Sequence, residues 1–400
     1  MMVMQKINFH CLTGWFISFV FYLLSQPAVA QSDSIAQKNW QLGGYVKDLK
    51  TVSFTNDLNT LLTGQLIHHR LNFKWMPVSR FTFAAELRNR LFFGEQVKYT
   101  PDFAKSVDVG NGIVDMSQVW VDKNTLVLHS ILDRLWAEYQ TDKWSIRAGR
   151  QRINWGINTV WNPNDVFNSY NFLDFDYEER PGTDAVRGQF FLSDFTNLDM
   201  AIAPAIKFDD WIAAAKYGFN KGGYDFQILI GKYRTDAAIG AGWAGNIGNA
   251  GWKGELTYFH PYQNFTKHRG TWSAATGVDY MFSKGWYLNA SMLFNSEGAN
   301  SLDNLAELYA FNLSPKSLMP TKLTTMLQVA KSFTPLFNGS AAMLYSPNGH
   351  LLAVLPALSY NIALNWDVDL IGQVFFAQTG NPQTFNNLGN SIFLRLKWSY

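Results

Sequence analysis

Apolar and polar residues alternate along most of this chain, in segments of about ten residues that are separated by turn residues. Because successive side chains of a β-strand point to opposite faces of a sheet, this period of two predicts strands with one apolar and one polar face. Eighteen such segments can be delimited, and a merged pair within the glycine-rich region 206–250 would give sixteen. They are 39–48, 60–75, 79–94, 131–140, 144–154, 184–193, 196–205, 211–219, 224–233, 236–245, 249–258, 271–281, 286–296, 323–333, 336–346, 349–363, 366–378 and 390–400.

The last ten residues show the alternation most clearly. One face carries Arg395 and Lys397, and the other is apolar: Ile392, Leu394, Leu396, Trp398 and Tyr400. The segment resembles the closing strand of a bacterial outer-membrane β-barrel, whose terminal aromatic residue is part of the signal read by the assembly machinery. The resemblance implies that the apolar face meets lipid, that the two cations face the lumen, and that the terminal aromatics Trp398 and Tyr400 contact that machinery. An ordinary half-buried antiparallel strand has the same pattern and is the alternative.

The first thirty residues have the features of a secretory signal peptide. Lys6 supplies a positive start, residues 12–24 form a short apolar run, and Ala28-Val-Ala30 is a small-residue cleavage site. We expect cleavage after Ala30, so that 1–30 is a signal peptide and 31–400 is exported; an uncleaved N-terminal anchor is the alternative. Cys11 is the only cysteine, so the exported chain has no disulfide.

The connections between the segments alternate between short and long. The short ones are 76–79, 141–143, 193–195, 220–223, 245–248, 283–285, 334–335 and 365–366, and the long ones include 95–130, 155–183, 259–270, 297–322 and 379–389. Outer-membrane barrels have short periplasmic turns and long extracellular loops, with both termini in the periplasm. We therefore predict an all-β, transmembrane antiparallel β-barrel of eighteen strands, or sixteen, in the cell outer membrane, in contact with its lipid and lipopolysaccharide. A secreted propeller or sandwich is the second choice, although no repeated blade motif is seen.

Composition agrees with a barrel and points to few partners. Aromatic residues make up 16% of the chain, and charged residues also make up 16%, which is below the roughly 25% of soluble domains. The formal net charge is +2, and no basic tail or aromatic-basic interleaving suggests a nucleic acid.

The predicted polar faces of the early strands are rich in arginine. The candidate pore-lining residues are Arg70, Arg88, Arg90, Arg134, Arg147, Arg150, Arg152 and Arg187, with Glu86 and Glu138 among them. Arg147 is out of register with Arg150 and Arg152, and a β-bulge near Gly149 would bring all three to the lumen. Guanidinium groups suit carboxylate or phosphate solutes and set ion selectivity in a water-filled pore. The alternative is that acids neutralise these arginines in a structural ladder.

The stretch from 147 to 187 contains the most distinctive motif. A strand ending in Gly149-Arg-Gln-Arg-Ile-Asn-Trp-Gly156 is followed by an Asn-Pro loop and by Glu179-Arg-Pro-Gly182 before the next strand. This resembles outer-membrane porins of the alginate-export type, in which long loops partly occlude a wide passive pore. The resemblance implies that the arginines at 147, 150 and 152 line the pore. It also implies an inward-folded constriction loop with these charged residues: Asp174, Asp176, Glu178, Glu179 and Arg180. The other arginines cannot be matched one by one, so the resemblance does not extend to a polyuronate substrate.

The predicted function is passive diffusion through this lumen. Small anionic solutes or oligosaccharides would pass a constriction where Arg88, Arg90, Arg134, Arg150 and Arg152 face the acidic 174–179 loop, with a modest preference for anions. The alternative function is a surface barrel associated with capsule or other polysaccharide, with an occluded lumen.

Catalysis is not expected. His68 and His69 point to opposite faces of one strand, and no serine motif accompanies His260, His268 and His350, which can meet at one mouth of the barrel. No spacing typical of a zinc site is present. We therefore expect no enzyme activity, no metal and no cofactor.

Overall fold

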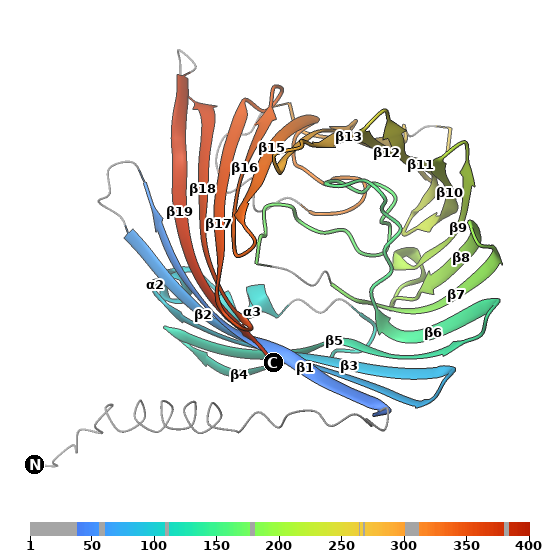
Figure 1. Cartoon of the computed structure of the whole chain (residues 1–400), viewed down its shortest axis with the longest axis horizontal. Helices are drawn as coiled ribbons and strands as arrows, with labels where there is room; N and C mark the ends of the chain where they lie inside the picture. The colour runs from blue at the N-terminus through green and yellow to red at the C-terminus, as the bar shows by residue number, and fades with distance from the viewer. Residues whose placement is uncertain are drawn as a thin grey trace, which may run out of the picture. The chain divides into compact units, whose positions relative to one another are not determined.

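The computed structural model of the chain describes residues 38–55, 61–108, 112–176, 181–263, 265–266, 269–300, 312–379 and 384–400. The predicted signal peptide lies outside the described residues. Asn39–Tyr400 form one structural unit, a single antiparallel sheet wound around a lumen (Figure 1).

All eighteen predicted strands are present, with ends that shift by a few residues. The strands are β1 Trp40–Phe54, β2 Leu61–Val78, β3 Phe81–Gly94, β4 Ser117–Lys123, β5 Leu126–Gln140, β6 Trp144–Gln151, β7 Thr183–Ser193, β8 Thr196–Ala203, β9 Ile212–Lys221, β10 Tyr224–Tyr233, β11 Asp236–Ile247, β12 Ala250–Pro261, β13 Thr271–Met281, β14 Trp286–Asn295, β15 Leu323–Thr334, β16 Phe337–Ser346, β17 Leu351–Ala363, β18 Trp366–Thr379 and β19 Thr384–Ser399. The helices of the described residues are α2 Glu95–Tyr99, α3 Phe103–Val107 and the single-turn η1 Phe208–Asp210. None of these helices combines the length and apolar character needed to cross a bilayer.

The sheet closes on itself. β19 pairs with β18 on one side and with β1 on the other, and β1 also pairs with β2, so blue β1 meets red β19 in Figure 1. β3 pairs directly with β5, and β4 pairs only with the first part of β5. Eighteen strands of the described residues therefore close the ring, and β4 is an additional short strand. The prediction of eighteen strands is confirmed, and the alternative of sixteen is wrong.

The segment 95–130 differs from the predicted long loop. It contains α2, α3 and β4, and β5 begins at Leu126, before the predicted start at 131. The alternation of Ser117–Lys123 extends over too few residues to be distinguished from a loop, and β4 is a strand because β5 offers it a free edge.

The two rims of the barrel have different connections. At one rim, which we call the short-turn rim, only a few residues join each pair of strands. These pairs are β2 and β3, β5 and β6, β7 and β8, β9 and β10, β11 and β12, β13 and β14, β15 and β16, and β17 and β18. Tyr400 and the start of β1 also lie there. At the other rim, which we call the long-loop rim, are the long connections 95–125, 152–182 and 296–322. As predicted, no long connection lies at the short-turn rim, although the long-loop rim also has short connections at 234–235 and 347–350.

The last strand has its apolar and polar faces where its sequence predicts them. Ile392, Leu394 and Leu396 are exposed on the outside of the barrel. On the inside, Arg395 Nε lies 2.9 Å from a carboxylate oxygen of Asp369 on the neighbouring strand. An apolar outer band around a charged interior is the arrangement of a membrane-spanning barrel.

The C-terminal tyrosine fastens the closing seam. The backbones of Tyr400 and Gly44 exchange two hydrogen bonds, of 3.0 and 3.1 Å. The Tyr400 hydroxyl then reaches past β1 to β2, where it lies 3.1 Å from the carbonyl oxygen of Arg70 and 2.9 Å from Nε2 of His69. A Cβ atom at Gly44 would lie 2.0 Å from that carbonyl oxygen and 2.8 Å from the hydroxyl. Only glycine leaves room for this contact.

We expect Gly44→Val to weaken the seam, because the added side chain would push Tyr400 away from β2. The cost should be about 1–3 kcal/mol, as for other overpacked sites. The measurement is the temperature at which the detergent-folded barrel loses its compact mobility on a denaturing gel. Gly188→Val on β7 is the matched control, since the nearest atom to a Cβ there is 3.8 Å away. Equal transition temperatures for the two variants would contradict the prediction.

Candidate functional site in the barrel lumen

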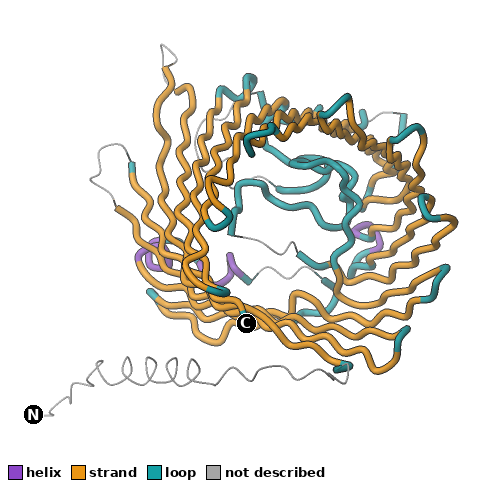
Figure 2. The backbone as a smooth tube through the Cα atoms, in the orientation of Figure 1, coloured by secondary structure: helices purple, strands orange, loops and turns teal. Residues whose placement is uncertain are grey.

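The described part of the long connection 152–182 folds into the lumen of the barrel and does not extend outward from the rim. Figure 2 shows loop segments within the ring of strands. The aromatic side chains of this segment are as buried as a protein core, with Trp155 at 1% and Trp161 at 2% exposure. They pack against lumen-facing strand residues in two clusters, which include Leu229 and Phe259 on one side and Leu293 and Phe375 on the other. We call the described residues of this connection, 152–176 and 181–182, the inward loop.

Hydrogen bonds attach the inward loop to opposite sides of the ring. Near its start, the Trp155 indole donates to Asp199 on β8 at 2.9 Å, and Gln227 on β10 donates to the Trp155 carbonyl at 2.7 Å. Near its far end, Gln373 on β18 donates to the carbonyl of Leu173 at 2.9 Å. Because β10 and β18 are far apart in the order of the ring, the inward loop crosses the lumen.

The first arginines of the predicted wall share one buried acid. Asp133 on β5 accepts from Arg70 Nη1 at 2.8 Å and from Arg88 Nη2 at 3.0 Å, and Glu86 also contacts Arg70. A register shift between β3 and β5 makes Asp133 an extra residue, which turns its side chain to the lumen beside Arg134. Strict alternation would place Asp133 on the outer face, so the sequence pattern missed it.

The remaining arginines form separate pairs. Arg147 lies 3.0 Å from Glu138 and stacks over the Trp136 ring at 4.1 Å. Arg150 binds Asp184 at 2.7 Å, and residues 112–114 cover this pair. Arg187 Nε donates to Asp199 at 2.9 Å. These pairs match the alternative reading of the sequence, in which acids neutralise the wall.

Three further arginines lie elsewhere on the wall. Arg90 donates to the Val107 carbonyl at 2.8 Å and lies 3.1 Å from Nδ1 of His129. Arg134 donates to the Asp133 carbonyl at 3.2 Å. Arg152 is half-buried where β6 passes into the inward loop.

The β-bulge predicted near Gly149 is not present. The pairing of β5 with β6 runs without a shift from Gln140 opposite Ser145 to Leu135 opposite Arg150. Instead, Gly149 has a φ of 116°, and a Cβ there would lie 2.2 Å from the Leu135 carbonyl oxygen. Arg147 and Arg150 consequently join different ion pairs and not one cluster.

The acidic part of the inward loop meets cations other than those predicted. Asp176 lies 2.8 Å from Nζ of Lys47, which is fully buried, and 3.6 Å from Arg395. Desolvation by the surrounding protein raises the pKa of the Asp174 carboxyl, and the charge of Asp176 raises it further. Glu178, Glu179 and Arg180 lie outside the described residues.

A large cavity lies where the inward loop faces β1–β3, β18 and β19. It encloses about 900 Å³. Arg88, Arg90 and His68 line one part of it, and Asp174 and Asp176 line another. The rest is mostly apolar and aromatic, with these residues: Leu49, Leu66, Phe92, Phe103, Phe175, Phe375 and Phe393. Two of the five predicted constriction arginines thus share a cavity with the loop acids.

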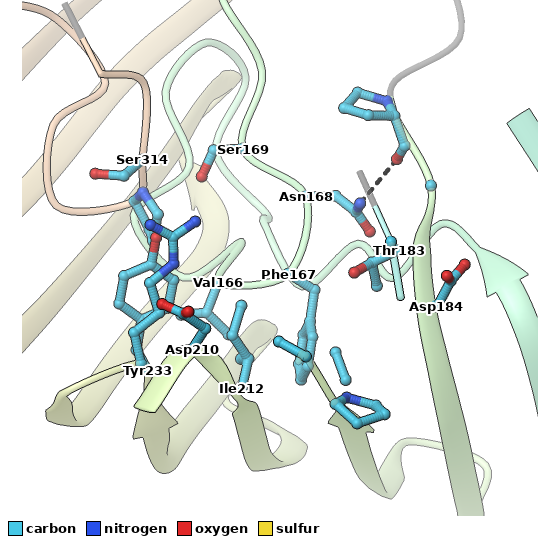
Figure 3. A pocket seen from close by; sticks show the side chains of 18 of the residues that line it. Val166, Phe167, Asn168, Ser169, Thr183, Asp184, Asp210, Ile212, Tyr233 and Ser314 are labelled. Atoms are coloured by element: carbon cyan, nitrogen blue, oxygen red, sulfur yellow. Dashed lines mark hydrogen bonds between the residues drawn. The ribbon is translucent and has the colours of Figure 1, made fainter. Parts of the chain in front are cut away.

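A second cavity of about 510 Å³ lies on the opposite side of the inward loop. Figure 3 shows the loop residues 166–169 between Tyr233 and Asp210 on one side and Thr183 and Asp184 on the other. Its lining combines apolar residues such as Val166, Phe167 and Ile212 with polar and charged side chains, which include Asn168, Ser169, Thr183, Tyr233, Asp184, Asp210 and Arg234.

Several residues of the site were not predicted from the sequence. Lys47, Asp199 and Asp369 lie at lumen positions of their strands and could have been read from alternation alone. Glu255, the only acid of its strand, binds the inward loop, and nothing in the pattern pairs it with a segment ninety residues earlier. Within the described residues, no group of three His, Cys, Asp or Glu side chains is arranged to hold a metal ion.

Comparison with solved structures shows which proteins share this fold. OccAB4 of Acinetobacter baumannii superposes with a TM-score of 0.58 at 11% sequence identity, over 91% of this chain and 99% of that one. OccK9 (OpdG) and OpdQ of Pseudomonas aeruginosa give TM-scores of 0.58 and 0.57 at 8% identity, again over 91% of this chain and 99% of each of theirs. By sequence, no protein-family model and no curated protein matches this chain.

The chain is therefore an outer-membrane β-barrel with the fold of these bacterial proteins. This confirms the predicted fold class and location, on the combined basis of the closed ring, its apolar outer band and the structural matches. The matches are of the Occ type, and the resemblance to alginate-export porins stays a prediction.

We expect Asp133→Asn to destabilise the barrel strongly. Removal of this charge leaves two buried guanidinium groups without their shared partner, which costs about 3–5 kcal/mol for a buried ion pair. The measurement is the free energy of unfolding in urea, followed by tryptophan fluorescence in detergent. Asp102→Asn is the control, because Asp102 is paired only with the exposed Lys105. A loss below 1 kcal/mol would show that the arginines do not depend on Asp133.

Proposed function

We propose that this barrel is a porin-like channel for the passive diffusion of small solutes, with a modest preference for anions. The observation that carries the proposal is the cavity of about 900 Å³ at the inward loop, where Arg88 and Arg90 lie on the wall. A barrel of eighteen strands is too wide for wall side chains alone to fill. The inward loop then determines how much of the lumen stays open.

The preference for anions should be small because the lumen is nearly charge-balanced. Arg70, Arg147, Arg150 and Arg187 each have an acid within ion-pair distance. A paired guanidinium adds little net potential to the pore. Oligosaccharides could form hydrogen bonds with the polar residues of the second cavity, which include Asn168, Ser169, Thr183 and Tyr233.

A second function is favoured by a different observation. Trp155 and Trp161 are buried as deeply as core residues, and a loop packed so densely suits an occluded lumen in a barrel associated with surface polysaccharide. Planar-bilayer recording separates the two proposals, since an occluded barrel gives no steady conductance.

The outer surface suggests partners of the barrel itself. We infer that its apolar band contacts outer-membrane lipid and lipopolysaccharide. Trp398 and Tyr400, whose rings lie 5.3 Å apart at the short-turn rim, are our candidates for contact with the assembly machinery.

We expect Arg90→Glu to shift the selectivity toward cations. The replacement reverses a charge on the wall of the larger cavity, so the anion-to-cation permeability ratio should fall by about twofold or more. The measurement is the reversal potential of the purified protein in a salt gradient. Arg80→Glu, at an exposed turn of the short-turn rim, is the control. An unchanged reversal potential for Arg90→Glu would place the solute path elsewhere.

A further inference from the structure

Glu255 on β12 holds the backbone of the inward loop. Its side chain is almost completely buried, at 1% exposure. Oε1 accepts hydrogen bonds from the backbone N–H groups of Ile157 and Asn158, at 2.5 and 2.8 Å. Oε2 accepts one from the backbone N–H of Asn164 at 2.9 Å. One carboxylate thus satisfies three donors in two separate parts of the loop.

The strands beside Glu255 leave space for the loop. Directly opposite it are Gly242 on β11 and Ala275 on β13. A Cβ at Gly242 would lie 3.0 Å from both Asn164 Nδ2 and Ile157 Cδ1. At Gly240 it would lie 2.5 Å from Asn164 Oδ1. We call Gly240, Gly242, Glu255 and Ala275 the loop seat, and it accounts for the glycine-rich strand that made region 206–250 difficult to interpret.

Neighbouring side chains hold the same part of the loop. The Asn164 side chain donates to the Ala241 carbonyl at 3.0 Å and accepts from the Thr257 hydroxyl at 2.7 Å. Lys253 Nζ lies 3.3 Å from the Thr159 hydroxyl. Three successive lumen-facing side chains of β12 therefore form hydrogen bonds with the loop at 157–164.

The energetics favour Glu255 as the main attachment. A buried backbone N–H without a partner is unfavourable, and a hydrogen bond to a charged group stabilises more than one to a neutral acceptor. A buried carboxylate is in turn tolerated only when hydrogen bonds compensate for its lost hydration. Glu255 therefore gives the N–H groups of the loop an acceptor, and these N–H groups compensate the carboxylate for its lost hydration.

We propose that Glu255 is the positioning residue that fixes the inward loop across the lumen and thereby sets the open cross-section of the channel. This rests on the proposed channel function. Glu255 acts through the loop and need not touch the solute.

The test compares single-channel conductance and solute size limit for the wild type and Glu255→Ala in planar bilayers and in liposome swelling with sugars of increasing size. Loss of all three hydrogen bonds should free the loop, which raises the mean conductance at least about twofold, or makes it fluctuate between levels, and admits larger sugars. Glu255→Gln should have a smaller effect in the same direction, because its amide oxygen can still accept from Ile157 and Asn158 while its amide nitrogen cannot accept from Asn164.

Asp367→Asn is the matched control. Asp367 is also an acid on a strand that accepts a hydrogen bond, but its partner is Asn361 of the neighbouring strand at the short-turn rim, 2.9 Å away, so the size limit should stay that of the wild type. Glu255→Ala with the conductance and size limit of the wild type would overturn the proposal.

A second variant guards against misfolding. Gly242→Leu fills the loop seat without any change of charge, and it should reproduce the larger conductance and size limit. Heat-dependent gel mobility confirms that each barrel is closed. If Glu255→Ala does not fold, a wild-type size limit for Gly242→Leu overturns the proposal.

The outcomes also separate this proposal from the channel function. A silent wild type that conducts once Glu255 is replaced would refute the open channel and support the positioning role. A conducting wild type whose variants are unchanged would support the channel and refute the positioning role.

Discussion

The requirement that no strand edge meets lipid governs this structure. In a bilayer every backbone N–H and C=O must find a partner within the protein, so a sheet can span the membrane only as a closed ring. Closure here depends on β1 and β19, and on Gly44, where the absence of a side chain lets the Tyr400 hydroxyl reach β2. A ring of eighteen strands encloses more space than wall side chains can fill. Other parts of the protein must therefore fill the space that the wall side chains leave.

Two kinds of interaction occupy the surplus space. Ion pairs such as those around Asp133 bridge neighbouring strands of the wall, and they use up charges that a sequence pattern would assign to the solute. The inward loop fills the middle, with tryptophans packed as in a core and backbone donors bound to Glu255. The lumen is therefore a packed interior with cavities on either side of one crossing segment. In the proposed channel, selectivity would depend on the wall and pore size on the inward loop.

Much of the fold could be predicted because its signals are local. The period of two delimits strands, and the alternation of short and long connections orders them into a barrel. The site was less accessible, because ion pairs depend on which residues of neighbouring strands are opposite each other. One extra residue in β5 brought Asp133 inside, and an expected bulge at Gly149 was a positive φ instead. The hydrogen bond from the backbone N–H of Asn158 to the Glu255 carboxylate joins segments that share no local pattern, so alternation could not reveal it.

The far end of the inward loop has a consequence for the order of assembly. Asp176 is held by Lys47 of the first strand and by Arg395 of the last, and these two strands become neighbours only when the ring closes. The binding site for the loop end therefore does not exist in a barrel that is still open. The chain must therefore complete its wall before the end of the inward loop can bind, so the lumen acquires its final packing only after the ring has closed.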